Sequence, residues 1–400
     1  MRGCFVQVVE SVRRRLEPLF PELVRLRREL HRYPEIAFEE RRTRETARAF
    51  CAETPGLEFS ETAKTGLLAV TAGTAPGPTT VLRACLDALP ITDEKVVPYA
   101  SKLSGRCHAC GHDAQVAALA GALRVLAEDP PPGRAIGLFQ PAEEADTGAQ
   151  AVLADGALDA YEPDLMIGFH GHPGLAVGQI GVAAGPIMAA ITTVRCVVSG
   201  RGGHGAEPHM TADPVTAAAQ LIVDWQVALG RRTDGRDAVV LSVGRLHAGT
   251  ASNVIPDRVE LDGTLRYLDP GLREPVERTL TDVAHAIEIR TGASVALTFD
   301  RAVPALVNDG AAADLVAGVV AETFGGDALV RATPSLGGDD FARYLEAGHR
   351  GCYVFVGERQ EGRPAYGWHD PDYDLDERSI PIAAALLAAV AHRAARGGVQ

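Results

Sequence analysis

Residues 107–113 have the sequence "CHACGHD", which places two cysteines, two histidines and an aspartate within seven positions. The apolar stretch "AQVAALAGALRVLAE" follows at residues 114–128 and has a composition typical of a buried helix. We expect Asp113 to be the N-cap of that helix, because an aspartate side chain can accept hydrogen bonds from the first free backbone amides. The motif alone is compatible with a structural zinc site, a redox Cys-x-x-Cys pair or one side of a catalytic metal centre.

Short apolar segments alternate with helical ones around this motif, a pattern that predicts a sheet covered by helices. The expected strands include "LLAVTA" (67–72), "TVLRACLD" (80–87), "RAIGLFQP" (134–141) and "DLMIGF" (164–169). Glu143 and Glu144 lie in the loop beyond the third of these strands, and His170 lies at the end of the fourth. Loops at strand ends of an open α/β sheet converge on one crevice, so we expect these polar residues to meet there.

The second half of the chain begins differently, near residue 186. A β-branched segment (191–200) is followed by a helical stretch (214–229), strands at 238–246 and 258–268, a long helical stretch (271–291) and a strand at 293–299. This βαββαβ order predicts a ferredoxin-like α+β insert. We therefore expect an α/β catalytic domain of residues 1–186 and 304–400, interrupted by an inserted domain of residues 187–303.

Length, charge and cysteine content limit the classes of function. A chain of 400 residues exceeds the size that one hydrophobic core usually organises, in agreement with two domains. A net charge of −13 argues against nucleic acid or an anionic membrane as a partner. No apolar run approaches the roughly 20 residues that span a bilayer. Seven scattered cysteines, an odd number without a secretion signal, indicate a reducing compartment, and we expect a cytoplasmic protein.

The three interpretations of residues 107–113 differ in what else they require. A structural zinc site needs a second closely spaced pair of ligands, and none lies within the usual reach of Cys107 and Cys110. A redox Cys-x-x-Cys pair leaves His112 and Asp113 without a purpose. Catalysis by a metal-activated water needs ligands and a separate carboxylate that moves a proton, and the adjacent acids of "PAEE" (141–144) offer both. The combination favours a catalytic metal centre.

An ordered set of short motifs carries a resemblance to a known family. These motifs are "LHRYPEIAFEE", "LDALPI", "HACGHDA", "PAEE", "GRGGHGAEPH", "SNVIPD", "GTLR", "DDF" and "WHDPDYDLDE". They resemble the hippurate hydrolase and indole-acetyl-amino-acid amidohydrolase group of the aminoacylase and carboxypeptidase G metallopeptidases. The resemblance extends from about residue 22 to about residue 390. It implies a zinc-peptidase-like catalytic domain with an inserted lid and dimerisation domain.

The resemblance also assigns roles in the catalytic domain. It implies two divalent metal ions per subunit, with Glu143 as the general base. The implied metal ligands are Cys110, His112, Glu144, His170 and His369. A thiolate, three imidazoles and a carboxylate suit zinc and also accept manganese, cobalt or nickel. Asp87 and Asp113 are implied as carboxylates that orient histidines, although turn or N-cap roles remain open for both.

In the lid, His204 matches a histidine that reaches the active site of the partner subunit and stabilises the oxyanion, so we expect a homodimer. Asn253 and Arg266 match residues that hold the carboxylate of the substrate. The expected activity is hydrolysis of N-acyl-L-amino acids, such as hippurate-, N-acetyl- or indole-acetyl-amino-acid-like compounds. A dipeptidase or carboxypeptidase with the same two-metal centre is the alternative, and a catalytically silent metal-binding protein is a more distant one.

Some positions depart from the family pattern. Cys85 stands where an aspartate is expected, and Gln115 replaces a histidine in "HDAH". Gly338 and Asp339 replace the first two residues of "SEDF". None of these changes removes an implied ligand. Cys85 should lie close to the metals, and we expect it to alter metal preference or sensitivity to oxidation.

Overall fold

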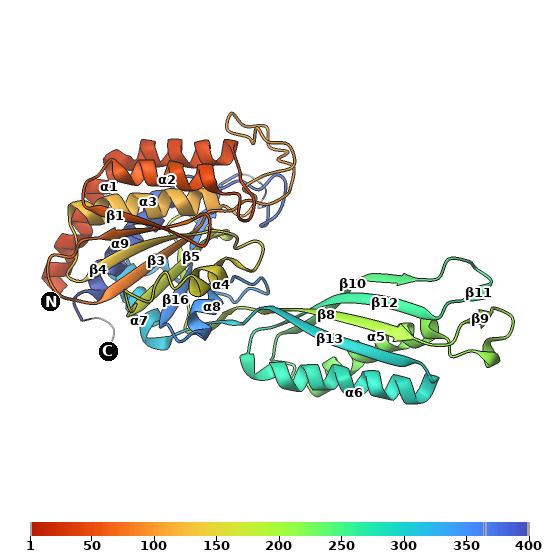
Figure 1. The fold of residues 1–400 in the computed structure, drawn as a ribbon. Helices are drawn as coiled ribbons and strands as arrows, with labels where there is room; N and C mark the ends of the chain where they lie inside the picture. Colours follow the sequence, from red (N-terminus) through yellow and green to blue (C-terminus); the bar gives the residue numbers. More distant parts are fainter. Residues whose placement is uncertain (1, 363, 365, 398–400) are drawn as a thin grey trace. The chain divides into compact units, whose positions relative to one another are not determined.

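The chain forms two compact units in a computed structural model that describes residues 2–362, 364 and 366–397. Unit 1 contains the chain up to residue 187, residues 307–333 and the chain from residue 340 onward. Unit 2 contains residues 188–306 and 334–339. Both units combine helices with sheets, which confirms the predicted α/β class (Figure 1).

Unit 1 is built on an eight-stranded sheet of order β1-β2-β4-β3-β5-β16-β6-β15. The strands are β1 (Leu57–Thr62), β2 (Gly66–Thr71), β3 (Thr79–Cys85), β4 (Arg134–Gln140), β5 (Leu165–Ala176), β6 (Ile180–Val182), β15 (Leu329–Arg331) and β16 (Gly351–Arg359). β3 runs parallel to β4 and β5, and β5 runs parallel to β16. The carboxyl ends of these central strands therefore lie at one edge of the sheet.

Helices cover this sheet. They are α1 (Arg2–Arg32), α2 (Arg41–Ala52), α3 (His112–Glu128), α4 (Gly148–Ala154), α7 (Gly310–Phe324), α8 (Ala342–Glu346) and α9 (Ser379–Ala394), with the 3-10 turn η3 (Gly326–Ala328). α1, α3, α7 and α9 share one hydrophobic core with the sheet. α3 and α9 consist largely of alanine, leucine and valine and are buried along most of their length, as expected for helices enclosed between a sheet and other helices.

The two faces of the sheet are distinguished by alternation along β3. Leu82 and Ala84 point into the core shared with α3 and α9. Arg83 points the opposite way, and its guanidinium pairs with Asp340 at 2.8 Å, with both side chains fully buried. Gln140 bonds to both partners, so this buried pair keeps its hydrogen bonds satisfied. The pair ties the central strands to the segment that leads into α8.

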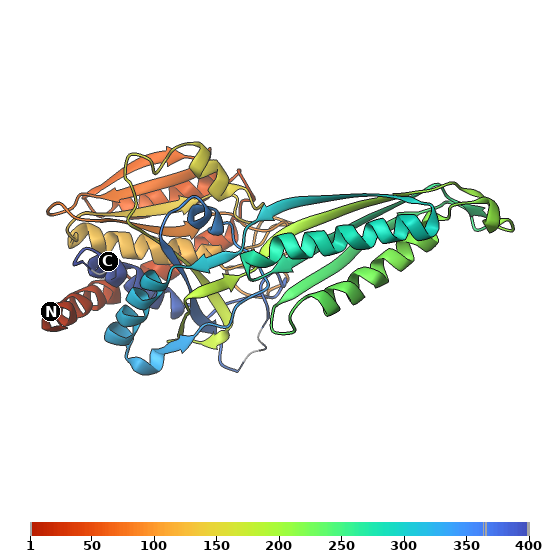
Figure 2. The same cartoon turned by 90° about the horizontal axis from the view of Figure 1, so that it is seen from below.

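Unit 2 is a four-stranded antiparallel sheet with two helices on one face (Figure 2). In chain order it contains β8 (Ala190–Ser199), α5 (Pro214–Arg232), β10 (Val239–Ala248), β12 (Arg258–Tyr267), α6 (Arg273–Thr291) and β13 (Ser294–Val303). The sheet order β10-β12-β8-β13 is that of a ferredoxin-like fold, as predicted. Asp213 caps α5 by accepting from the amides of Val215 and Thr216, and Pro214 occupies the first helical position.

Shorter elements complete the chain. β9 (Gly203–His204) pairs with β11 (Val254–Ile255), and β7 (Gly185–Met188) pairs with β14 (Leu306–Asn308). The 3-10 turns η1 (Pro208–Met210) and η2 (Pro270–Leu272) precede α5 and α6. Within the described residues no helix is both long and apolar enough to cross a bilayer. The expected cytoplasmic location stays a prediction.

The core of unit 2 is small, so truncating one of its side chains should measurably lower the free energy of unfolding. Leu221 of α5 is fully buried there, whereas Val223 on the same helix is 60% exposed. We expect Leu221→Ala to lower the free energy of unfolding of this unit by about 2–5 kcal/mol, because a cavity replaces packed atoms. The matched control Val223→Ala should change it by less than about 0.5 kcal/mol. Urea unfolding followed by Trp225 fluorescence in a Trp368→Phe background measures both changes, and equal effects would contradict the assigned core.

Candidate metal centre

Four elements of unit 1 bring the candidate site together. Glu143 and Glu144 follow β4, and His170 lies on β5, beside the end of β3. His112 is the first residue of α3, and Cys110 lies just before it. His369 lies in the loop after β16, where its backbone N–H donates to Ala109 O at 2.8 Å. The predicted convergence of these loops is therefore a consequence of the parallel central strands.

The five implied ligands form two groups that share one sulfur atom. Ligand atoms of Cys110, His112 and His170 lie within 4.8 Å of one another, and the same holds for Cys110, Glu144 and His369. Cys110 Sγ lies 3.2 Å from His170 Nε2. His369 Nε2 lies 3.3 Å from Glu144 Oε2. Two ligand sets that share a thiol could hold two metal ions close together.

The histidine rings are oriented by main-chain carbonyls. His112 Nδ1 contacts Asp87 O at 2.8 Å, and His170 Nδ1 contacts Gly171 O at 2.7 Å. Each carbonyl accepts the Nδ1–H, so Nε2 is the nitrogen that faces the site in both rings. Trp368 packs against the His170 ring at 5.0 Å between centroids and donates from Nε1 to the same Gly171 carbonyl at 3.0 Å.

The donor atoms fit a cation because some of them have no other partner. His112 Nε2 and Glu144 Oε1 are buried and make no hydrogen bond. A buried polar atom without a partner is costly, so both atoms are explained by a ligand at this place. Sulfur, imidazole nitrogen and carboxylate oxygen together suit zinc and related transition metals. The residues present therefore fit the metal ions that the resemblance implies.

Titration of the site reflects this crowding of acids and imidazoles. Burial raises the pKa of the Cys110 thiol well above its ordinary value, and Glu144 and Glu143 raise it further. Burial opposes the charged form of His112, but the hydrogen bond to Asp87 and the charge of Glu144 raise its pKa to about 9. A cation bound by these atoms would displace a proton from each, so its affinity would increase with pH.

Asp87 and Asp113 have different surroundings. Asp87 Oδ1 lies 3.5 Å from His112 Nδ1, and Asp87 Oδ2 accepts from the Glu144 amide at 2.8 Å. Asp113 contacts His31 at 2.7 Å and Arg27 at 2.8 Å. The prediction that Asp113 is the helix N-cap is wrong, because Gly111 takes that position with φ 79° and Asp113 lies in the first turn. Its carboxylate bonds to two buried cations, Arg27 and His31.

These two cations form a buried ion network below the ligand loop that sequence analysis did not identify. Arg27 also pairs with Asp374 at 3.0 Å, and His31 Nε2 lies 3.3 Å from Asp93. Arg27 and His31 are both on α1 and are fully buried. Their i, i+4 spacing places them on one helix face and was the only signal available in the sequence. The network anchors α1 to the start of α3, and thus to His112.

The three residues expected to belong to a lid lie in unit 2. His204 is exposed on β9, and its Nδ1 accepts from the Ala206 amide at 3.1 Å. Asn253 is exposed, and its carbonyl accepts from Gly205 N–H at 2.9 Å, so the segments that carry His204 and Asn253 lie side by side. Arg266 lies further along β12 and donates to Leu336 O at 3.0 Å. The structure therefore brings His204 and Asn253 together within this unit but leaves Arg266 apart.

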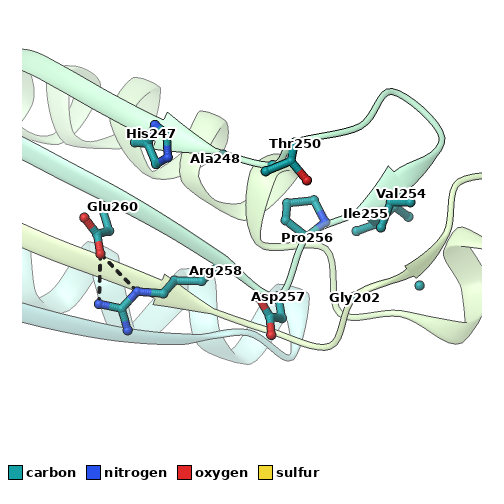
Figure 3. Close-up of a pocket in the computed structure, with 12 residues that line it drawn as sticks. Gly202, His247, Ala248, Thr250, Val254, Ile255, Pro256, Asp257, Arg258 and Glu260 are labelled. Carbon is teal, nitrogen blue, oxygen red and sulfur yellow. Dashed lines mark hydrogen bonds and ion pairs between the residues drawn. The ribbon is translucent and has the colours of Figure 1, made fainter.

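A groove of about 700 Å³ runs beside this pair of segments, lined by glycines, Val254, Ile255 and Pro256 together with polar residues. Figure 3 shows Arg258 in the groove with its guanidinium directed at Glu260, to which it donates at 3.1 and 3.2 Å. Arg258 is therefore already paired with a carboxylate of the chain and is not assigned to binding the carboxylate of a substrate.

Comparison with known proteins identifies the family. Residues 81–393 match the sequence pattern of peptidase family M20/M25/M40. The chain belongs to this family. It is 38% identical over 378 residues to an N-acetyl-L-cysteine deacetylase of Bacillus subtilis (strain 168), covering 93% of this chain and 88% of that protein. It is 34% identical over 396 residues to the IAA-amino acid hydrolase ILR1-like 2 of Arabidopsis thaliana, covering 96% and 88%.

A solved structure agrees with both the fold and the chemistry. A dinuclear metal-binding peptidase of family M20 from Bacillus subtilis superposes with a TM-score of 0.84 at 33% identity, covering 95% of this chain and 99% of that one. The predicted class of hydrolase and metallopeptidase-family protein is thus confirmed. Membership of the hippurate and indole-acetyl-amino-acid group within this family stays a prediction.

The buried ion network makes stability depend on pH. Burial disfavours the charged imidazole of His31, but Asp113 raises its pKa to about 10. A folded-state pKa above the unfolded value of about 6.5 gives stability that is full below pH 6.5 and is lost as the pH rises through about 10.

We expect His31→Gln to lower the free energy of unfolding at pH 6 by about 3 kcal/mol, because a member of a buried ion network is removed. The loss should shrink as the pH approaches 10. Urea unfolding between pH 6 and pH 10 measures it, with exposed His209→Gln as the control. A loss of equal size at every pH would contradict a protonated His31.

Proposed function

We propose that this protein is a metal-dependent amidohydrolase that cleaves the amide bond of N-acyl-L-amino acids. The observation that carries the proposal is the pair of ligand sets joined at Cys110, with Glu143 directly beside it. The relatives named above act on N-acetyl-L-cysteine and on conjugates of amino acids, and both are amide hydrolysis reactions. We assign two divalent ions to the centre, held by Cys110, His112, Glu144, His170 and His369.

Glu143 is the proton carrier in this proposal. Its side chain is buried, and its Oε2 lies 3.7 Å from His112 Nε2, so it borders the ligand set next to Glu144. Bound divalent ions would polarise the acyl carbonyl and make water a better acid. Glu143 then removes a proton from the attacking water and delivers it to the leaving nitrogen. Asp87 and the Gly171 carbonyl hold His112 and His170 in the tautomer that this arrangement needs.

Unit 2 serves as lid and dimerisation domain in this proposal. The amide of Ala206 fixes His204 through Nδ1, which leaves Nε2 to donate to the developing oxyanion in the partner subunit. β10 is an edge strand of the four-stranded sheet, and Val240 and Leu246 on it are exposed. An open edge with exposed apolar side chains supports pairing with a second copy. Asn253 and Arg266 are proposed to bind the substrate carboxylate.

A peptidase with the same centre is the second candidate, because the solved relative is described as a peptidase. The two candidates differ in whether the acyl side of the substrate carries a free amine. Release of amino acid from N-acetyl, N-benzoyl and indole-acetyl amino acids, and from dipeptides, separates them when each is measured with manganese, with zinc and with a chelator.

We expect metal-dependent release from the N-acyl amino acids, and a loss of about 10²–10⁴-fold in kcat for Glu143→Gln, because the proton carrier is removed. Exposed Glu10→Gln is the matched control and should retain full activity. Release from dipeptides alone would favour the peptidase, and no release under any condition would contradict the proposed reaction.

Metal binding by Glu143→Gln is measured separately from its activity. The chain has two tryptophans, Trp225 in unit 2 and Trp368 against His170. Trp225→Phe leaves Trp368, beside the centre, as the single tryptophan. We expect its fluorescence to change on metal addition equally with and without Glu143→Gln, since Glu143 is not assigned as a ligand. A loss of binding in Glu143→Gln would contradict its role as proton carrier alone.

Mixed dimers test whether His204 acts in the partner subunit. Glu143→Gln and His204→Ala each inactivate the homodimer if both residues are required. A mixed dimer then contains one site with Glu143 from one subunit and His204 from the other. Equal mixing after subunit exchange should restore about one quarter of the wild-type rate, because half of the dimers each regain one of two sites. No regain, or a fully active monomer by light scattering, would contradict action between subunits.

A further inference from the structure

Cys85 lies inside the candidate centre although none of the assigned roles includes it. It is the last residue of β3 and is fully buried. Its sulfur, a nitrogen of His112 and a carboxylate oxygen of Glu143 lie within 4.8 Å of one another. His112 therefore belongs to two ligand sets, one with the thiol of Cys110 and the other with the thiol of Cys85.

One ring nitrogen of His112 has no hydrogen-bond partner. Nδ1 contacts the Asp87 carbonyl at 2.8 Å, whereas Nε2 is buried without a hydrogen-bond partner and lies 3.7 Å from Glu143 Oε2. The His112 side chain itself is 0% exposed. This atom points to a ligand independently of the cysteine.

The backbone holds Cys85 in this place. Its N–H donates to Gln115 Oε1 of α3 at 3.2 Å, and its Cα is paired with Gln140 at the end of β4. Gln140 is followed closely by Glu143, and Gln115 lies three residues after His112. Both neighbours of Cys85 in the cluster are thus fixed by the same elements that fix the cysteine.

Another buried cysteine lies in a similar cluster but differs in one respect. Ligand atoms of Cys107, His31 and Asp93 also come together. In that cluster the ammonium of Lys95 bonds Asp93 at 2.8 Å and lies 3.3 Å from Cys107 Sγ. The positive charge that a metal ion would supply to these groups is therefore already supplied by a lysine.

We propose that Cys85 is a second thiolate ligand of the metal centre, on the His112 side and in addition to Cys110. The proposal rests on the proposed function in so far as the centre binds divalent ions. On binding, the Cys85 thiol releases its proton to solvent and the sulfur donates an electron pair to the ion. Two thiolates favour ions that bind sulfur well, such as zinc, cobalt and cadmium, over manganese.

Cobalt titration of metal-free protein without oxygen counts the thiolates directly. Each cobalt–thiolate bond contributes charge-transfer absorption in the near ultraviolet. Cys85→Ser and Cys110→Ser should each retain about half of the wild-type absorption per bound cobalt, and the double variant should lose it. Cys352→Ala, a buried cysteine on β16 outside the cluster, is the control and should equal wild type. Absorption in Cys85→Ser equal to that of wild type would overturn the proposal.

A second variant covers the case in which serine disturbs folding. Cys85→Asp supplies an oxygen donor in place of sulfur. Its preference for zinc over manganese, measured by competition with Trp368 fluorescence in the Trp225→Phe background, should fall by about tenfold or more. An unchanged preference would overturn the proposal.

Failure of the proposed function has a different signature. Wild-type protein would release no amino acid from any compound of the panel, while the cobalt absorption of wild type and Cys85→Ser would still differ. Hydrolysis by wild type combined with equal absorption of the two proteins would overturn the role of Cys85 alone.

Discussion

The parallel pairing of β3 with β4 and with β5 is the constraint on which the candidate centre depends. Parallel strands end at the same edge of a sheet, so residues far apart in the chain arrive at one place without any long loop to guide them. Cys85 is the last residue of β3, Glu143 lies just beyond β4, and His170 lies on β5 beside the end of β3, close to His112 at the start of α3. A slip of one residue in this pairing would turn the side chains of Cys85 and His170 to the opposite face of the sheet. Register and metal binding are therefore linked.

Concentrating thiols, carboxylates and imidazoles in a buried place requires support from further away. The network of Arg27, His31 and Asp113 provides two positive charges directly below the ligand loop, and Arg83 with Asp340 braces the other face of the sheet. Each of these charges is fully buried and paired, which is the condition under which buried charge is tolerated. The charge balance of the centre is thus set by residues that do not belong to it.

The sequence was sufficient for the architecture and for the location of the centre, because the ends of β3 and β4 and the residues just beyond them are visible as local pattern. The predicted strand end before His170 was wrong, because β5 continues to Ala176. The ferredoxin-like order of unit 2 followed from alternating periodicities alone. The sequence did not predict which of several possible partners a polar side chain bonds. Asp113 has the right position for an N-cap, yet Gly111 caps α3 and Asp113 bonds to Arg27 and His31 on α1. Such long-range ion pairs leave no periodic signal, and neither did the packing of Trp368 on His170.

Backbone conformation adds a cost that the sequence also hides. Ala142, just before Glu143, has φ 54°, and His369 has φ 67°. A side chain disfavours this region, at about 1–3 kcal/mol per residue, so the surroundings must hold both residues there. Ala142 N–H donates to Glu40 Oε1 at 2.9 Å, and its carbonyl accepts from Gly148 N–H at 3.0 Å. His369 is held by the Ala109 carbonyl. His369 is itself a member of the set of Cys110, Glu144 and His369. Ala142 directly precedes Glu143, the neighbour of Glu144 in the chain. The surrounding structure therefore offsets the cost of these two backbone conformations beside the ligands. Proteins commonly violate local backbone preferences at functional sites and compensate elsewhere.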